Sequence, residues 1–220
     1  MARPKKKSCD DTSCLHVMRP RVDPDRRAMD ALCPDDDDDA LNLVERRIVS
    51  VVNRSLDASH AVLTDCLIER CDLANAVFRR ARLNRVAFVD CRLVGADFGD
   101  ESWLEDVTFA GCTLDLSTFD RASLRRVVFS HTRLEGAAFG GASLERIAFP
   151  DCALARCDFT GASAPGGAGS IDLRGASLAA ASFDTRLLRA LTISPEDGAT
   201  IAAALGITVK VGCAQTTCKD

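Results

Sequence analysis

The chain has 220 residues, of which 47% are hydrophobic, and it carries 28 Lys and Arg against 32 Asp and Glu. This composition suits one sizeable folded domain with tails, and no run approaches the roughly 20 apolar residues that a membrane-spanning helix needs. The N-terminal residues lack the apolar stretch of a secretion signal, so we expect a cytoplasmic protein without membrane contact whose 11 Cys are reduced thiols.

A charged segment comes first in the chain. Residues 1–27 hold eight Lys and Arg against four Asp, whereas residues 28–45 hold seven acids, five of them in the run from Asp35 to Asp39. Blocks of like charge are usually solvated and form no packed core. We therefore expect residues 1–39 to be a disordered charged tail.

Residues 40–60 are expected to form a capping segment at the N-terminal end of the folded part. Their apolar residues Leu41, Val44, Ile48 and Val51 stand near helical spacing after an acidic start. An open sheet edge invites aggregation unless something covers it. We predict a short helix or strand in this position, and a helix that binds a partner is the alternative.

A period of five residues runs from Ala61 to Arg189. The central residue of nearly every block of five is large and apolar, and the residue two places before it is small or medium-sized. The regular central residues are Leu63, Ile68, Leu73, Phe78, Leu83, Phe88, Leu93, Phe98, Phe109, Leu114, Phe119, Leu124, Phe129, Leu134, Phe139, Leu144, Phe149, Leu154 and Phe159. A period of five matches neither a helix nor a strand, so the backbone must turn a corner every five residues.

This pattern resembles the pentapeptide-repeat family, in which a small apolar residue, a polar residue, Leu or Phe, and two polar residues recur. The resemblance implies an all-β fold, a right-handed quadrilateral β-helix with short terminal helices, in which four blocks make one coil over residues 61–189. About six coils stacked at the strand spacing of roughly 4.8 Å give a rod on the order of 30 Å long.

Residues 20 apart then share a face, and we number the faces from the one that contains Leu63. The second contains Ile68, the third Leu73 and the fourth Phe78, so columns of Leu and columns of Phe alternate around the rod. Six Cys take the smaller inward position, where a buried thiol acts as a small apolar group. They are Cys66, Cys71, Cys91, Cys112, Cys152 and Cys157.

Two stretches interrupt the repeat. The block from Glu101 to Asp106 holds one extra residue, which implies a bulge where Trp103 and Leu104 compete for the inward position. Residues 162–171 are rich in Gly and Pro and are predicted to be a loop that leaves the coil. Both stretches can display surface features.

Residues 190–211 are predicted to be a helix and a strand that cap the C-terminal end. Ser194 is an N-cap residue before Pro195 and two acids, the helix stops at Gly206, and residues 207–211 follow as a strand. The family resemblance implies a second reading, in which the terminal helix joins two rods end to end as a homodimer. Residues 212–220 are expected to be a disordered tail.

Residues that could carry chemistry are scattered. The three His, His16, His60 and His131, stand at no motif spacing from a nucleophile, and the sequence has no glycine-rich phosphate loop. Cys9 and Cys14 with His16 meet structural-zinc spacing only at its limit. We therefore expect no enzyme activity, no cofactor and no metal site.

The second face offers a candidate partner surface. Nine of the ten outward residues that flank its apolar column are uncharged, whereas the other faces carry Arg and Asp at many such positions. A contiguous apolar strip marks a partner or a covering segment more often than chance. Its representative residues are Leu67, Val89, Val128 and Ala148.

Two functions remain open. The gyrase-protecting branch of the family, the mycobacterial and Qnr-type quinolone-resistance proteins, is held to present a DNA-like rod with negative faces to the topoisomerase. The resemblance therefore implies a DNA mimic that modulates gyrase and confers quinolone protection. However, residues 51–188 carry 18 acids against 15 Arg, which is a poor imitation of DNA.

We therefore predict first a non-enzymatic binding or scaffold protein that contacts an unidentified protein partner through the faces of its rod. Direct nucleic-acid binding is not expected. The basic residues of the first face, such as Arg82 and Arg125, lack interleaved aromatic residues and stand beside acids such as Glu105.

Overall fold

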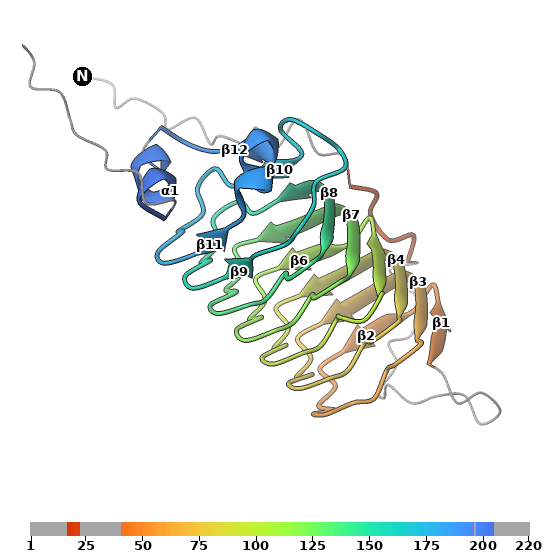
Figure 1. The fold of residues 1–220 in the computed structure, drawn as a ribbon. Helices are drawn as coiled ribbons and strands as arrows, with labels where there is room; N and C mark the ends of the chain where they lie inside the picture. The colour runs from red at the N-terminus through yellow and green to blue at the C-terminus, as the bar shows by residue number, and fades with distance from the viewer. Residues whose placement is uncertain (1–16, 23–40, 196, 205–220) are drawn as a thin grey trace, which may run out of the picture.

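A coil of four short sides is the repeating unit of the molecule, and the coils stack on one another to form a rod (Figure 1). The computed structural model describes residues 17–22, 41–195 and 197–204. Along the rod, one strand from each of eight successive coils pairs in parallel with the next, in the order β1-β3-β4-β5-β7-β8-β10-β12. The structure thus extends the expected six coils by one at each end.

The strands are short because each side of the coil is about one block wide. They are β1 (Asn42–Val44), β2 (Arg47–Val49), β3 (Val62–Glu69), β4 (Arg82–Val89), β5 (Trp103–Glu105), β6 (Thr108–Ala110), β7 (Ser123–Ser130), β8 (Ser143–Ala148), β9 (Asp158–Phe159), β10 (Ile171–Asp172), β11 (Ser182–Phe183) and β12 (Leu191–Thr192). The helical elements are a 3-10 helix, η1 (Thr185–Ala190), and one α-helix, α1 (Gly198–Ala204).

The register confirms the predicted columns. Leu63 pairs with Leu83 and Ile68 with Phe88, an offset of 20 residues in both cases. The offset becomes 21 where Leu83 pairs with Leu104. It becomes 24 where Ile147 pairs with Ile171, because the Gly- and Pro-rich loop leaves the coil between these rungs.

The extra residue of the fourth rung is absorbed at a corner and not within a strand. Asp100 and Glu101 both have positive φ, at 51° and 68°, and they turn the chain just before β5. Ser102 then fills the small inward position and is fully buried, and its hydroxyl donates to the Phe98 carbonyl oxygen. Leu104 points inward with no exposed surface, and Trp103 is left on the outside with 42% exposed.

Two columns of phenylalanine fill the interior. All ten Phe of the chain belong to the second and fourth faces. Within a column the rings stack, as Phe78 does on Phe98 with centroids 4.8 Å apart and planes 3° apart. Between columns the rings meet edge to face, as Phe78 and Phe88 do at 6.3 Å and 79°. Stacked and edge-to-face contacts are both favoured by the ring quadrupole, so the centre is dry, packed core.

Residues 41–60 form the first coil of the stack. Leu43 pairs with Leu63, and Ile48 pairs with Ile68. Of the expected short helix or strand, the structure has strand, in β1 and β2, because the spacing of five from Leu43 to Ile48 continues the repeat. Val44 lies on the outside with 52% exposed.

The C-terminal end differs from the prediction in its details. Residues of the last regular block form η1, whose N-cap Asp184 accepts a hydrogen bond from the Arg186 backbone N–H. The helix α1 begins at Gly198 and not beside Ser194, because Ser194 instead closes a turn with Asp197. The strand expected at residues 207–211 lies outside the described residues. End-to-end pairing through the helix stays a prediction.

Candidate interaction surfaces

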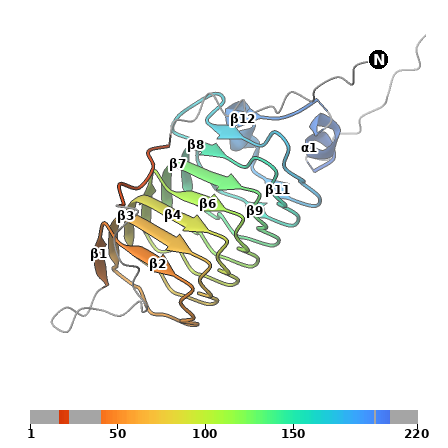
Figure 2. The ribbon, with the colours of Figure 1, turned by 180° about the vertical axis from the view of Figure 1, so that it is seen from behind.

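The predicted strip lies on the outside of the second face, along β3, β4, β6, β7 and β8 (Figure 2). Leu67, Val89 and Val128 are half-buried, and Ala148 is buried with only 4% of its surface exposed. The strip is therefore a flat surface of small, partly covered side chains. Ala148 contributes less to it than the sequence indicated, because almost none of its surface is exposed.

A charged column borders this strip at the corner between the first and second faces. Asp65, Arg85, Asp106 and Arg126 occupy the corner in four successive rungs, each with positive φ between 51° and 55°. The Arg85 guanidinium binds the Asp65 carboxylate through two nitrogens at 2.7 and 2.6 Å. Arg126 binds Asp106 in the same way at 2.7 and 2.6 Å. Paired hydrogen bonds of this type are strong and directional.

The two carboxylates of the column are buried, which makes their pairing necessary. Asp65 is 6% exposed and Asp106 is 2% exposed. The hydrogen bond from Arg85 lowers the pKa of Asp65. Burial pushes the pKa of Asp106 upward, but the hydrogen bond from Arg126 outweighs it, so that this pKa is lowered as well. Both acids are therefore ionised near neutral pH.

A short piece of the N-terminal region, residues 17–22, lies on this corner. The backbone N–H of Met18 donates to Asp106 Oδ1 at 3.3 Å, and that of Arg21 donates to Asp65 Oδ1 at 3.1 Å. The segment runs lengthwise along the rod, in red in Figures 1 and 2. We call it the N-terminal strap. The charged column holds the strap by its main chain.

Elsewhere on the rod, carboxylates are mostly engaged by arginines of a neighbouring rung. Arg79 lies 2.6 Å from Asp97 on the fourth face. Arg54 lies 2.7 Å from Asp72 on the third face, and its hydrogen bond lowers the pKa of Asp72. Further pairs of this kind join Arg47 to Glu69, Arg121 to Asp100, Arg133 to Asp115 and Arg156 to Glu135. Such pairing neutralises the negative charge that a DNA-like surface would have to present.

The candidate chemical groups lie apart from one another. In the described part of the chain, no group of three His, Cys, Asp or Glu is placed to hold a metal ion. His131 is exposed and lies 3.5 Å from Asp151. Cys9, Cys14 and His16 lie outside the described residues. Over those described, no helix is long and apolar enough to cross a membrane.

The six inward Cys are buried free thiols. Cys152 donates to the Phe129 carbonyl oxygen at 3.0 Å, and Cys157 donates to that of Leu134 at 2.9 Å. Burial raises the pKa of each of these two thiols to about 12. A thiol with a raised pKa stays protonated near neutral pH, and only the thiolate is reactive. We therefore interpret both Cys as structural groups.

Comparison with protein families agrees with this architecture. Residues 60–100 match the model of pentapeptide repeats in eight copies, and residues 102–183 match that of a pentapeptide repeat region. Together the two matches span more than half of the chain. The chain belongs to the pentapeptide-repeat family.

Solved structures of this family include similar rods. Full-length QnrB1, a plasmid-mediated fluoroquinolone resistance protein, is 17% identical, and the match covers 73% of this chain and all of that one with a TM-score of 0.42. HetL from the cyanobacterium Nostoc sp. strain PCC 7120, involved in heterocyst differentiation regulation, is 19% identical over 68% of this chain and 75% of its own, with a TM-score of 0.39. No curated protein sequence matches the chain.

One surface of this pentapeptide-repeat rod was missed by the sequence analysis. Three of the exposed large apolar side chains, Val44, Val62 and Trp103, project from the first face, at 52%, 37% and 42% exposed. Val52 and Leu116, elsewhere on the rod, are more exposed, at 70% and 67%. The signal in the sequence was the competition between Trp103 and Leu104, which periodicity alone left undecided.

Proposed function

We propose that this pentapeptide-repeat protein is a non-enzymatic scaffold that binds a protein partner along its second face and the charged corner beside it. One observation carries the proposal. The corner already holds a stretch of polypeptide, because Asp65 and Asp106 accept hydrogen bonds from the main chain of the N-terminal strap.

The chemistry of the corner suits extended polypeptide in general. A buried carboxylate that is neutralised by one arginine keeps lone pairs for a further donor, and a backbone N–H is a donor that almost every residue supplies. The strip beside the corner, in which nine of ten residues are uncharged, adds apolar contact area, and its one acid, Glu69, is already paired with Arg47. The corner supports main-chain binding, and the strip supports side-chain contacts.

The test replaces Val89 and Val128 together by Arg. Both side chains lie outside the core columns, so the fold should survive while any partner on the strip meets two unpaired charges. A photo-cross-linking residue at position 67 should capture one specific protein in cells, and the double variant should lose it. The matched control is Thr118→Arg with Ala138→Arg on the fourth face, which should keep the cross-link.

If the Val89 and Val128 variant melts normally and still forms the cross-link, the second face is not the partner surface. Sedimentation of the same variants separates a foreign partner from a second copy of this chain. A second copy on the strip would dissociate only in the Val89 and Val128 variant.

Gyrase modulation is the alternative function, and it has its own measurement. A supercoiling assay with a quinolone, with and without the protein, should show no protection, because inter-rung arginines engage most of the carboxylates. Protection of gyrase by the unmodified chain would favour the DNA-mimic function over a general scaffold.

A further inference from the structure

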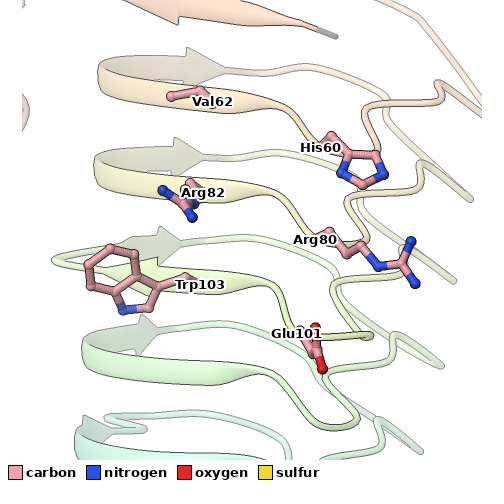
Figure 3. A pocket seen from close by; sticks show the side chains of 6 residues that line it. All are labelled: His60, Val62, Arg80, Arg82, Glu101 and Trp103. Atoms are coloured by element: carbon pink, nitrogen blue, oxygen red, sulfur yellow. The ribbon is translucent and has the colours of Figure 1, made fainter.

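The edge of the rod where the fourth face meets the first carries a cavity of about 430 Å³. His60, Val62, Arg80, Arg82, Glu101 and Trp103 line it. Figure 3 shows these side chains in two columns across three rungs. Val62, Arg82 and Trp103 project from the strands, and His60, Arg80 and Glu101 stand at the preceding corner.

The cavity exists because the extra residue is taken up at the corner. Asp100 and Glu101 turn the chain with positive φ, and Leu104 therefore takes the inward position in the Leu column. The large indole of Trp103 is left on the outside, in the same outward column as Arg82 of the next rung and Val62 of the rung beyond it, which is 37% exposed.

The arginines of the cavity differ from most of those on the rod. Arg79, the residue before Arg80, is paired with Asp97 at 2.6 Å. Arg80 and Arg82 are exposed and form no ion pair within residues 41–195. The cavity therefore combines an indole with two arginines that form no ion pair among the described residues.

Tryptophan and arginine are the residues that most often dominate protein interfaces. A single carboxylate fits Arg82 or Arg80, neither of which forms an ion pair among the described residues, and an apolar side chain fits against Trp103. A polynucleotide, which needs a continuous row of cations, fits less well, because the next rung of this edge carries Glu101 and Glu105. At 430 Å³ the cavity is near the small end of ligand sites and accepts a short segment.

We propose that the Trp103 cavity is a docking site for an acidic segment of a protein partner that inserts an apolar side chain. The site lies on a different edge from the second-face strip, so it stands whether or not the proposed scaffold surface is correct. The arginines favour an acidic partner by charge complementarity, and the indole of Trp103 favours a partner that also supplies an apolar side chain.

The chain offers its own reporter for this site. Trp103 is the single Trp and the chain has no Tyr, so the intrinsic fluorescence of the intact protein comes from the cavity. The probe is a capped heptapeptide of Glu and Asp with a central Phe, added to the full chain. We expect a saturable change in Trp103 emission below about 1 mM peptide. No saturable change in that range overturns the proposal.

Charge-reversal variants distinguish peptide binding in this cavity from non-specific attraction to any arginine on the rod. Arg80→Glu with Arg82→Glu should weaken binding by about tenfold or more, because it reverses both charges that face the peptide. The control is Arg70→Glu with Arg146→Glu, two exposed arginines at other corners, and it should bind as the unmodified chain does. Equal weakening by both pairs overturns the site. Circular dichroism checks folding, and Arg80→Gln with Arg82→Gln provides a milder variant.

Three further probes and one variant of the chain decide between occupants. A peptide with Ala in place of Phe should bind more weakly, and a Lys-rich peptide should not bind. A thymidine oligonucleotide that binds more tightly than the acidic peptide would assign the cavity to nucleic acid and overturn the proposal. A chain with Asp35 to Asp39 changed to Asn should show unaltered emission without peptide. A shift there would assign the cavity to the chain's own acidic run.

Discussion

At the scale of single residues, the repeat separates inward from outward positions sharply. Phe119 is fully buried and stacks between Phe98 at 5.0 Å and Phe139 at 4.9 Å. Arg121, two residues later, turns the corner with a φ of 59° and pairs with Asp100 on the surface. Two residues that are close in the sequence therefore differ greatly in how much stability a substitution removes.

Replacing Phe119 by Asp should abolish cooperative unfolding, because it removes a stacked ring and buries a charge without a partner. Replacing Arg121 by Asp should change the free energy of unfolding by less than about 1 kcal/mol, since the lost ion pair is exposed. Thermal melts followed by circular dichroism measure both. Equal losses from the two changes would contradict the five-residue register.

The buried thiols make a second prediction at this scale. Because burial raises the pKa of Cys152 and Cys157 to about 12, almost no thiolate forms at neutral pH. Iodoacetamide should leave both residues unmodified in the native chain at pH 8, and peptide mass spectrometry should find them fully modified after unfolding in guanidinium. Rapid native labelling of either would mean that the Cys does not point inward.

At the scale of elements, the corner between the first and second faces is the part of the rod that most needs its charges. The paired side chains cross rungs, since Asp65 and Arg85 are 20 residues apart, and Asp106 and Arg126 are too. The same carboxylates hold the N-terminal strap, since Asp106 accepts from Met18 N–H and Asp65 accepts from Arg21 N–H. Protonating them weakens contacts between rungs and contacts to the strap together.

This corner predicts an acid-dependent stability. The pKa values of Asp65 and Asp106 are lowered from the ordinary 3.8 by their arginines. A lowered carboxyl pKa stabilises the fold above the unfolded-state pKa, and this contribution disappears as the pH falls through the folded-state pKa. The melting temperature should therefore fall below about pH 4, and Asp65→Asn with Asp106→Asn should reduce that fall.

Melting curves between pH 7 and pH 2 provide the measurement. The Asn variant should be clearly less stable than the unmodified chain at pH 7, and the two should converge at the acid end. Parallel curves over the whole range would show that these two carboxylates do not govern the acid response.

At the scale of the whole molecule, stability is transmitted between neighbouring coils. The core is one continuous stack, so each inner coil packs against two others. Among the described coils, the one formed by residues 41–60 packs only against the rung of β3, to which Glu45 and Ser50 donate backbone hydrogen bonds at 2.9 Å. The rungs of β4 and β7 are paired on both sides.

Hydrogen exchange should therefore be graded along the rod. Amides of residues 41–60 should exchange faster than those of β4 and β7, because opening an end coil breaks one interface and opening an inner coil breaks two. Exchange measured by mass spectrometry on peptides from these regions tests the gradient. Uniform protection from Asn42 to Phe159 would indicate that the rod opens only as a whole.

The sequence alone determined the coil, its four faces and the inward or outward direction of nearly every residue between Ala61 and Phe159. This was accessible because the rule is local: a period of five repeats, and each rung only has to match the next. The same rule already held in residues 41–60, where Leu43 and Ile48 continue the columns. The apolar residues there also stand near helical spacing, so the sequence left a helix and a strand both open.

Only the tertiary structure showed which residues form the Trp103 cavity and the contact with the N-terminal strap. The choice between Trp103 and Leu104 depended on where one extra residue was absorbed, and several corner geometries can absorb it. The contact of Met18 with Asp106 spans 88 residues. Such contacts have no period that a sequence could reveal, because they depend on which side chains the stacked rungs bring together in space.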